Sequence, residues 1–323
     1  MPDIVFLFMQ SKTVPIVFTD AHFARIKEVS GGEVYRFETE EELLKSGIEA
    51  EILFTWGGTG VMPEEYCVKN KSLKWFHSFS SGMDPVMKSE IAKLPIMITN
   101  SREVHAIAIG EHVMGFIIAY NRTFPFMFKK QSEHIWAKGM TRKPQEAIGK
   151  TVGIIGAGAI GTSIARNAKG FRMKTIGLRR NPQPCEYFDE MLGADELDKL
   201  LSDSDYIVSA VPLKPDTRHI IGAAEFSKMK STALFVNVAR GGVVDQDALI
   251  EALREGRIGG AALDVTDPEP LPPDSPLWDM ENVMITPHMS ADTPMTSQWA
   301  TDSFCDNLMR YMAGEPLLNL CEH

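Results

Sequence analysis

The sequence predicts an α/β protein with two doubly wound domains, each a parallel sheet covered by helices on both faces. Its 323 residues are too many for one ordinary hydrophobic core, and the 44% hydrophobic content is ample for globular folding. Short apolar strand-like runs alternate with polar helical segments along the chain. Strands that alternate with helices in this way are typical of parallel sheets.

The first hundred residues contain four strand-like runs. They are DIVFLF from Asp3, AEILFTW from Ala50, LKWFHSFS from Leu73 and PIMITN from Pro95. The amino-terminal run has no basic region before it and no small-residue cleavage site, so we interpret it as a strand and not as a signal peptide. The apolar stretch 104–120 is short for a membrane span and carries charge, so a buried helix is expected there.

A second strand–helix series begins at Lys150 and contains six continuous apolar runs. They are TVGIIGAG, KTIGLRR, SDYIVSAVP, ALFVNVAR, GGAALDV and NVMITPH. Continuous apolar strands are expected when helices cover both faces of a sheet, and six are the complement of a Rossmann dinucleotide-binding sheet. Between the two series, residues 124–136 hold many aromatic side chains. This segment is either an arm that packs on another subunit or part of the domain core.

Composition excludes several classes of function. The formal net charge of −10 argues against a nucleic-acid-binding surface. The four scattered cysteines have neither zinc spacing nor the density of a disulfide scaffold, so no metal is expected and the thiols are taken as reduced. With no membrane span expected either, the sequence predicts a cytoplasmic protein.

A glycine-rich loop follows the first strand of the second series. Gly156, Gly158 and Gly161 form G-x-G-x-x-G between TVGII and a helix-forming run. The first glycine permits a tight turn, the second lets the backbone approach a pyrophosphate, and the third allows close helix–strand packing. The helix amino terminus then offers N–H groups to phosphates. A plain strand-to-helix turn is the alternative, but the strand before and the helix after favour a nucleotide site.

Arg179 and Arg180, at the end of the second strand, are the residues expected to contact the cofactor ribose and any 2′-phosphate on it. NAD-preferring domains usually place a carboxylate about twenty residues after the glycines to bind the ribose 2′-hydroxyl. Here two guanidinium groups stand instead, and they could bind a 2′-phosphate. The sequence therefore favours NADP(H) over NAD(H), although a solvated loop with two surface arginines is the alternative.

Three polar residues at strand ends form a chemical set: Arg240, Glu269 and His288. Ligands of open parallel sheets bind beyond the carboxyl ends of the strands, so the three could meet in one crevice. Histidine can donate a proton to a carbonyl near neutral pH, a carboxylate can stabilise its imidazolium form, and arginine can hold a substrate carboxylate. Each residue alone has an ordinary structural alternative: a hydrogen-bonding histidine, a turn-capping arginine or a loop charge.

At these motifs the sequence resembles the D-isomer-specific 2-hydroxyacid dehydrogenase family. The matching stretches are VGIIGAGAIG, SDYIVSAVPLKPDTRHIIG, FVNVARGGVVDQDAL and GGAALDVTDPEPLPPDSPLWDMENVMITPH, which cover most of residues 150–288. In the first domain, FHSFSSGMDPV is similar to the substrate loop of the family, and GEHVMGFIIAYNR is similar to its connecting helix.

The resemblance implies a role for each matching residue. Arg240 would orient the substrate, His288 would be the acid–base and Glu269 its partner, while backbone N–H groups of Ser81 and Gly82 would hold the substrate carboxylate. The remaining expected contacts are all with the cofactor: Ala159 and Ile160 with the pyrophosphate, Val211 and Pro212 with the ribose, Asp264 with the nicotinamide carboxamide, and Val238 and Ala239 beside them.

The resemblance also implies the domain plan. A flavodoxin-like substrate domain, residues 1–101 with 288–323, would flank a Rossmann cofactor domain, residues 102–287, with a cleft between them. The family is usually a homodimer built through the cofactor domains, which would account for the aromatic segment 124–136. Selectivity for the substrate side chain would depend on first-domain loops such as Trp56-Gly57-Gly58 and Met83, although Trp56 could equally be core.

Two departures from the family pattern and three alternatives bear on function. Arg179 replaces the acidic residue of NAD-preferring members, and TPHMSADTP replaces the commoner small apolar residues after the histidine. The expected activity is reduction of a small 2-keto acid with NADPH. A non-catalytic NAD(H)-sensing corepressor is the alternative from another class, and phosphite and phosphoglycerate dehydrogenases are the alternatives among enzymes. The end of the sequence at His323 disfavours the long-chain phosphoglycerate enzymes, and Glu269 disfavours formate dehydrogenase.

Overall fold

The computed structural model describes residues 1–8, 17–56, 62–139 and 143–321. The chain divides into two compact units, one of Met1–His105 with Asp292–His323 and one of Ala106–Ala291. The sequence predicted that the chain passes from the first domain to the second after residue 101 and returns after residue 287. The predicted last strand, with His288 at its end, therefore stays wholly within the second unit. The cleft expected between the units stays a prediction.

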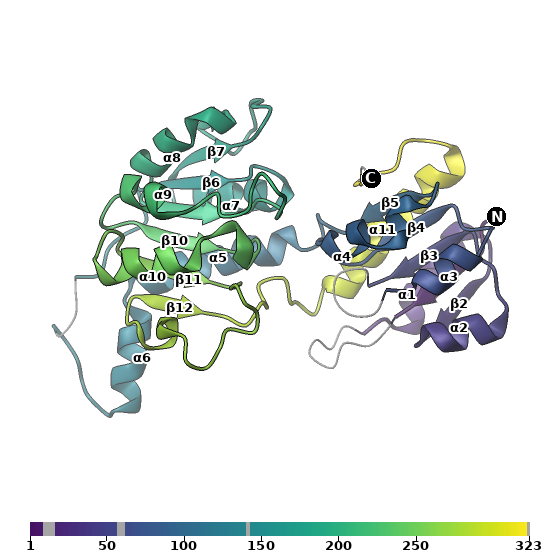
Figure 1. Ribbon diagram of the computed structural model, residues 1–323, viewed down its shortest axis with the longest axis horizontal. Helices are drawn as coiled ribbons and strands as arrows, with labels where there is room; N and C mark the ends of the chain where they lie inside the picture. Colours follow the sequence, from purple (N-terminus) through teal and green to yellow (C-terminus); the bar gives the residue numbers. More distant parts are fainter. Residues whose placement is uncertain (9–16, 57–61, 140–142, 322–323) are drawn as a thin grey trace. The chain divides into compact units, whose positions relative to one another are not determined.

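The first unit is a five-stranded parallel sheet in the order β2-β1-β3-β4-β5, which is the order of flavodoxin-like folds (Figure 1). The strands are β1 (Ile4–Leu7), β2 (Val34–Phe37), β3 (Ile52–Thr55), β4 (Trp75–Ser78) and β5 (Met97–Asn100). The helices are α1 (Asp20–Ser30), α2 (Glu40–Ser46), α3 (Glu64–Lys69), α4 (Asp84–Lys88), the 3₁₀ turn η1 (Glu90–Lys93) and the carboxyl-terminal α11 (Thr296–Ala313).

Both faces of this sheet are buried because successive strand residues point to opposite sides. Ile4 and Phe6 pack with α1 and α11 on one face, and Val5 and Leu7 pack with α2, α3 and α4 on the other. The carboxyl-terminal helix, yellow in Figure 1, therefore covers one face of a sheet whose strands all come from the first hundred residues. This packing is why the first unit is discontinuous in sequence.

The second unit is a seven-stranded parallel sheet in the order β12-β11-β10-β9-β6-β7-β8. Read from β8, this is the Rossmann order with one further strand, β12, at the end. The strands are β6 (Thr151–Ile155), β7 (Lys174–Leu178), β8 (Glu190–Leu192), β9 (Tyr206–Ser209), β10 (Leu234–Asn237), β11 (Gly260–Leu263) and β12 (Val283–Ile285). The helices are α5 (Ala106–Asn121), α6 (Phe124–Ser132), α7 (Ala159–Gly170), α8 (Leu197–Asp203), α9 (Ala223–Lys228) and α10 (Gln246–Arg254), with 3₁₀ turns η2 (Ala194–Glu196), η3 (Gly241–Val243) and η4 (Pro276–Asp279).

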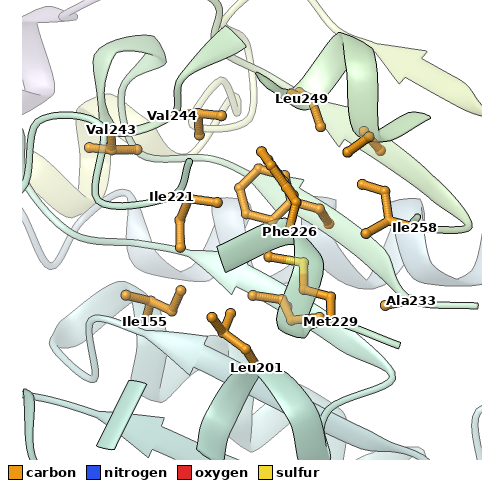
Figure 2. Close-up of a cluster of buried hydrophobic side chains, with 14 of the residues drawn as sticks. Ile155, Leu201, Ile221, Phe226, Met229, Ala233, Val243, Val244, Leu249 and Ile258 are labelled. Carbon is orange, nitrogen blue, oxygen red and sulfur yellow. The ribbon is translucent and has the colours of Figure 1, made fainter. Parts of the chain in front are cut away.

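Two apolar layers enclose the second sheet. Helices α5 and α7 pack on one face, and α8, α9 and α10 pack on the other. Phe226 of α9 lies at the centre of the second layer in Figure 2. The residues labelled around it there are Ile155, Leu201, Ile221, Met229, Ala233, Val243, Val244, Leu249 and Ile258. Complete burial of a side chain such as Phe226 stabilises a fold by about 1.5–3 kcal/mol relative to exposure.

The sequence analysis missed two strands, β2 and β8. Both lie at an edge of their sheet, and most of their residues are only partly buried. β2 contains Arg36, and β8 has only three residues beginning with Glu190, so neither gives the continuous apolar run that predicts the other strands, including the edge strands β5 and β12. The predicted runs of ten other strands all form in the described structure.

Helix α5 forms where the apolar stretch predicts a helix. None of the helices in the described part of the chain is long and apolar enough to span a membrane. Helix α6 differs from α5 because none of its side chains is buried in the chain. Phe128 is 62% exposed and the neighbouring Trp136 is 91% exposed, so the aromatic segment 124–136 is not core of this unit.

Candidate active site

The glycine-rich loop joins β6 to α7 and has the geometry of a phosphate-binding loop. Gly156 has φ +103°, a conformation that favours glycine, and a Cβ there would lie 2.7 Å from the Ala210 carbonyl oxygen. Both the backbone conformation and the lack of space therefore exclude a side chain. A Cβ on Gly161 would lie 2.3 Å from the Gly156 oxygen, which shows how closely α7 packs on the loop. A Cβ on Gly158 would meet no atom within 4 Å, so the backbone there is open to a ligand.

The start of α7 can receive an anion. Gly158 is the N-cap residue and provides no side-chain hydrogen bond to the helix. The first N–H groups of any helix lack acceptors within it, so those of Ala159 and Ile160 can bind phosphate oxygens. These residues therefore fit the pyrophosphate of a dinucleotide.

Val211 and Pro212 follow β9, the neighbour of β6 in the sheet. A Cβ built on Gly156 would lie 2.9 Å from Cγ1 of Val211, which places Val211 directly beside the glycine loop. The Pro212 carbonyl accepts a hydrogen bond from the Thr217 hydroxyl at 2.6 Å, which fixes the turn after the strand. The sequence motif and the structure thus bring the loops after β6 and β9 together.

The two arginines after β7 lie in different surroundings. The Arg179 backbone N–H donates to the Leu192 carbonyl at 3.1 Å, and its side chain is exposed. The Arg180 guanidinium donates to Asp216 at 2.6 Å, and both side chains are more than half exposed. Sequence reasoning found no carboxylate at this position, but the fold brings Asp216 to it from the loop after β9. Arg180 is therefore partly neutralised, and Arg179 is the arginine better placed to attract a phosphate.

Arg240 follows β10 and begins the 3₁₀ turn η3. Val238 and Ala239 before it are buried, and the Ala239 carbonyl accepts a hydrogen bond from Nη1 of Arg240 at 2.7 Å. The strand thus ends in a rigid, buried backbone that carries a partly buried guanidinium group.

Glu269 and His288 meet at the same edge of the sheet. Nδ1 of His288 lies 2.5 Å from Oε1 of Glu269, and the two side chains are 42% and 39% exposed. Glu269 comes from the loop after β11, and His288 follows β12, the neighbouring strand. Because Nδ1 bonds the carboxylate, Nε2 is the ring nitrogen that can face a substrate.

The surroundings of His288 favour its protonated form. The hydrogen bond that Nδ1 of His288 donates to the Glu269 carboxylate raises the pKa of His288 above its ordinary value. Partial burial opposes this shift, as does the positive charge of Arg240, whereas the charge of Asp264 supports it. A histidine with a raised pKa keeps its proton to higher pH and can donate it to a carbonyl oxygen.

Asp264 lies at the end of β11 and is buried. Its carboxylate accepts hydrogen bonds from the Thr286 hydroxyl and from the backbone N–H groups of Met289 and Ser290. The predicted contact with a nicotinamide carboxamide would therefore involve a carboxylate that already serves the turn carrying His288.

Ser81 and Gly82 lie in the first unit, after β4. The Ser81 carbonyl accepts a hydrogen bond from Nδ2 of Asn100 at 2.9 Å, which fixes the loop on β5. The Gly82 N–H, which was expected to hold a substrate carboxylate, donates to the Ser80 hydroxyl at 3.2 Å. A carboxylate that binds there must either displace the Ser80 hydroxyl oxygen as the acceptor of the Gly82 N–H or share this N–H with it.

Among the residues predicted to determine selectivity for the substrate side chain, Met83 is 9% exposed and packs in the core beside α4. Trp56 packs against Phe8 and Phe79 in the other core layer of the same unit, with ring centroids 5.8 and 5.0 Å apart. Gly57 and Gly58 lie outside the described residues.

Sequence reasoning missed four residues near the predicted sites: His112, Thr286, Asp216 and Asn100. His112 and Thr286 form a hydrogen-bonded chain with Asp264, although 174 positions separate them. The signals available were a polar histidine inside the apolar stretch 104–120 and a threonine directly before the Pro287-His288 pair. Neither signal indicates a partner. In the part of the chain that the structure describes, no group of three His, Cys, Asp or Glu could hold a metal ion.

A dinucleotide loop and a coupled histidine–carboxylate pair at the carboxyl edge of one Rossmann sheet define the class of protein: a dinucleotide-dependent oxidoreductase. The comparisons with known proteins agree. Residues 114–290 match the family model of the D-isomer specific 2-hydroxyacid dehydrogenase NAD-binding domain. The chain belongs to the D-isomer specific 2-hydroxyacid dehydrogenase family, as the sequence motifs predict, and it is an oxidoreductase with an NAD-binding domain.

Three relatives illustrate the family. The chain is 36% identical over 250 residues to a glyoxylate reductase of Korarchaeum cryptofilum, covering 75% of this chain and 74% of that one. It is 35% identical over 293 residues to a D-3-phosphoglycerate dehydrogenase of Methanocaldococcus jannaschii, and this match spans 90% of the chain but 55% of that longer protein. The crystal structure of an NADPH-dependent glyoxylate/hydroxypyruvate reductase from Sinorhizobium meliloti, in complex with NADP and sulfate, superposes with a TM-score of 0.80 at 26% identity, covering 100% and 98% of the two chains.

Proposed function

We propose that this protein reduces a small 2-keto acid to the D-2-hydroxy acid with NADPH, with His288 as the acid–base. The observation that carries the proposal is the contact of 2.5 Å between His288 and Glu269 at the carboxyl edge of the second sheet. A proton donor paired with a carboxylate is what ketone reduction needs, because the carbonyl oxygen gains negative charge as the carbon is reduced.

The chain supplies the binding groups for the cofactor, whose nicotinamide provides the hydride when bound. Backbone N–H groups at Gly158, Ala159 and Ile160 hold the pyrophosphate. The ribose and nicotinamide contacts come from residues at the ends of β9, β10 and β11, namely Val211, Pro212, Val238, Ala239 and Asp264.

The proton and the substrate are handled by side chains at the ends of β10, β11 and β12. His288 gives the proton on Nε2 to the substrate oxygen, and Glu269 holds the ring through Nδ1 and stabilises its charged form. Arg240 binds the substrate carboxylate. The contact of the same carboxylate with the backbone of Ser81 and Gly82 in the first unit stays a prediction. In the oxidation direction His288 accepts the proton instead.

Arg179 supports a preference for NADPH. It stands directly after β7, where NAD-preferring domains carry a carboxylate for the ribose hydroxyls. Its exposed guanidinium can bind a 2′-phosphate, whereas Arg180 is held by Asp216. The similar reductase from Sinorhizobium meliloti is described as NADPH-dependent.

Glyoxylate and hydroxypyruvate are the substrates we propose to be the best. Their reductases are among the proteins that the chain resembles. Both are small 2-keto acids whose carboxylate suits Arg240. The similarity to a phosphoglycerate dehydrogenase makes 3-phosphoglycerate oxidation the second candidate.

We also propose that unit Ala106–Ala291 is the cofactor domain and that two copies pair through its aromatic segment 124–136. In α6 no side chain is buried within one chain, and Phe124, Phe128 and Trp136 are exposed. Large exposed apolar side chains grouped on one segment are typical of interaction surfaces. A second copy would bury them.

The test is a panel of substrates assayed with NADPH and with NADH. Glyoxylate, hydroxypyruvate, pyruvate and a branched 2-keto acid are assayed for reduction, and 3-phosphoglycerate for oxidation. We expect the highest kcat/KM for glyoxylate or hydroxypyruvate with NADPH. A higher kcat/KM for 3-phosphoglycerate would make it the proposed substrate in place of glyoxylate and hydroxypyruvate. Equal kcat/KM values with NADPH and NADH would overturn the NADPH preference.

A further inference from the structure

The buried carboxylate of Asp264 organises the turn that carries His288. Its Oδ1 accepts hydrogen bonds from the Thr286 hydroxyl at 2.5 Å and from the Met289 N–H at 3.0 Å, and its Oδ2 accepts one from the Ser290 N–H at 3.1 Å. The Asp264 side chain is 1% exposed. A buried carboxylate is costly unless donors surround it, so these three bonds fix both the carboxylate and the turn.

The His288 backbone is held from both sides by Asp264. The His288 N–H donates to the Asp264 carbonyl at 2.8 Å, and the two residues after His288 donate to the Asp264 carboxylate. His288 has φ +52°, a left-handed conformation that residues other than glycine rarely adopt. Such a conformation persists only where surrounding contacts impose it, so the direction of the imidazole depends on these bonds.

His112 on α5 is the outer end of this network. Its Nε2 lies 3.0 Å from the Thr286 hydroxyl oxygen. The Thr286 hydroxyl hydrogen points to the Asp264 carboxylate, which can only accept, so the Thr286 oxygen must accept from His112. The ring of Phe116, one turn further along α5, packs edge-on against His112 with centroids 4.6 Å apart and fixes its orientation.

His112 acts in this network as a neutral hydrogen-bond donor. Partial burial lowers its pKa, and the nearby charge of Asp264 only partly opposes that shift. Near pH 7 the ring therefore carries a proton on Nε2 without a net charge. Its influence on the turn is one of geometry.

We propose that His112 is a positioning residue for His288: it holds the Thr286 hydroxyl on Asp264 and so fixes the turn that brings His288 to Glu269. The inference rests on the proposed function only in taking His288 as the acid–base. It gives α5, whose remaining side chains mostly fill the core, a direct connection to the reacting edge of the sheet.

The consequence for His288 follows from the groups that face it. Glu269 and Asp264 stabilise its protonated form, while Arg240 and partial burial destabilise it. Loss of the His112 donor lets the turn relax and weakens the contact of His288 with Glu269, which is the largest stabilising influence. The His288 pKa therefore falls.

The experiment compares His112→Phe, which keeps a ring but no donor, with His112→Gln, which keeps an N–H donor. The pKa of His288 is measured by NMR titration of the cofactor-free protein with ring-labelled histidine, and His288→Gln assigns the signal. We expect His112→Phe to lower this pKa and to reduce kcat about tenfold, the effect of one lost hydrogen bond. His112→Gln should restore most of both, with the dissociation constant for NADPH unchanged throughout.

Thr286→Val gives an independent test that leaves α5 intact. It should reproduce His112→Phe, and the double variant should be no worse than either single one, because both changes break the same chain. An unchanged His288 pKa in both single variants would overturn the proposal, as would a loss that His112→Gln fails to restore. The NMR result stands even if His288→Gln keeps full activity, so failure of the proposed function is recognised separately.

Discussion

Nδ1 of His288 lies 2.5 Å from Oε1 of Glu269, and the two residues follow neighbouring strands, Glu269 in the loop after β11 and His288 after β12. The contact fixes one ring nitrogen and leaves Nε2 for a substrate. It also raises the pKa of His288, opposing the effect of partial burial.

The first prediction concerns the proton donor. His288→Gln should reduce kcat by about 10²–10⁴, the usual contribution of a general acid. Glutamine keeps hydrogen-bonding capacity but cannot transfer a proton, so NADPH affinity, measured by fluorescence titration, should change less than twofold. If the turnover of the variant stays within tenfold of the native value, His288 is not the acid.

The second prediction concerns the pH dependence of reduction. Because Glu269 raises the pKa of His288, the imidazolium persists to higher pH, and reduction should decline only as pH rises through that raised pKa. Glu269→Gln should move this decline to lower pH. The pH profile of kcat/KM for glyoxylate measures both, and an unshifted decline in Glu269→Gln would mean that another group titrates.

The third prediction concerns cofactor choice. Arg179→Ala should weaken NADPH binding by about 10- to 100-fold, the value of a hydrogen bond to a charged group, and should leave NADH nearly unaffected. Arg180→Ala, the matched control, should have a smaller effect because Asp216 already binds that guanidinium. Ratios of kcat/KM for the two cofactors decide this, and a larger effect at Arg180 would reverse the assignment.

The fourth prediction concerns acid stability of the first unit. His77 is fully buried, its two ring nitrogens contact Thr99 and Ser101, and burial lowers its pKa from 6.5 to about 3. The unfolded chain therefore binds a proton below pH 6.5 that the folded unit does not. The free energy of unfolding should decrease as pH falls from 6.5 towards 3, by up to about 1.4 kcal/mol per pH unit for this one group.

Urea titrations between pH 4 and 8, followed by tryptophan fluorescence, measure that slope. His77→Gln should reduce the slope of the free energy of unfolding against pH by the contribution of about one proton. His105→Gln gives a second test, because burial lowers the pKa of His105 too. Slopes that match the native protein in both variants would contradict the prediction.

The fifth prediction concerns the aromatic segment 124–136. Phe128→Glu with Trp136→Glu should convert the proposed dimer into a monomer, because charged groups cannot be buried unpaired in an apolar interface. Phe171→Glu is the matched control, since Phe171 is exposed on the same unit but outside this segment. Light scattering coupled to size-exclusion chromatography measures the mass. A native protein that is already monomeric would remove the proposed pairing.

The sequence by itself determined ten of the twelve described strands, the glycine loop and the positions of Arg240, Glu269 and His288. These features are local: each of these strands is a continuous apolar run, and Gly156 is required by its own φ of +103°. Parallel strands align their carboxyl ends, so residues that follow β10, β11 and β12 share one edge whatever the details of the loops.

Only the tertiary structure decided which of these groups touch. The edge strands β2 and β8 bury little surface and left a weak pattern in the sequence. The carboxylate beside Arg180 comes from Asp216 on another loop, and the donor to Thr286 comes from His112 on a helix 174 positions away. Such pairs depend on how crossover connections pack across the sheet, and the chemical character of either residue alone does not specify its partner.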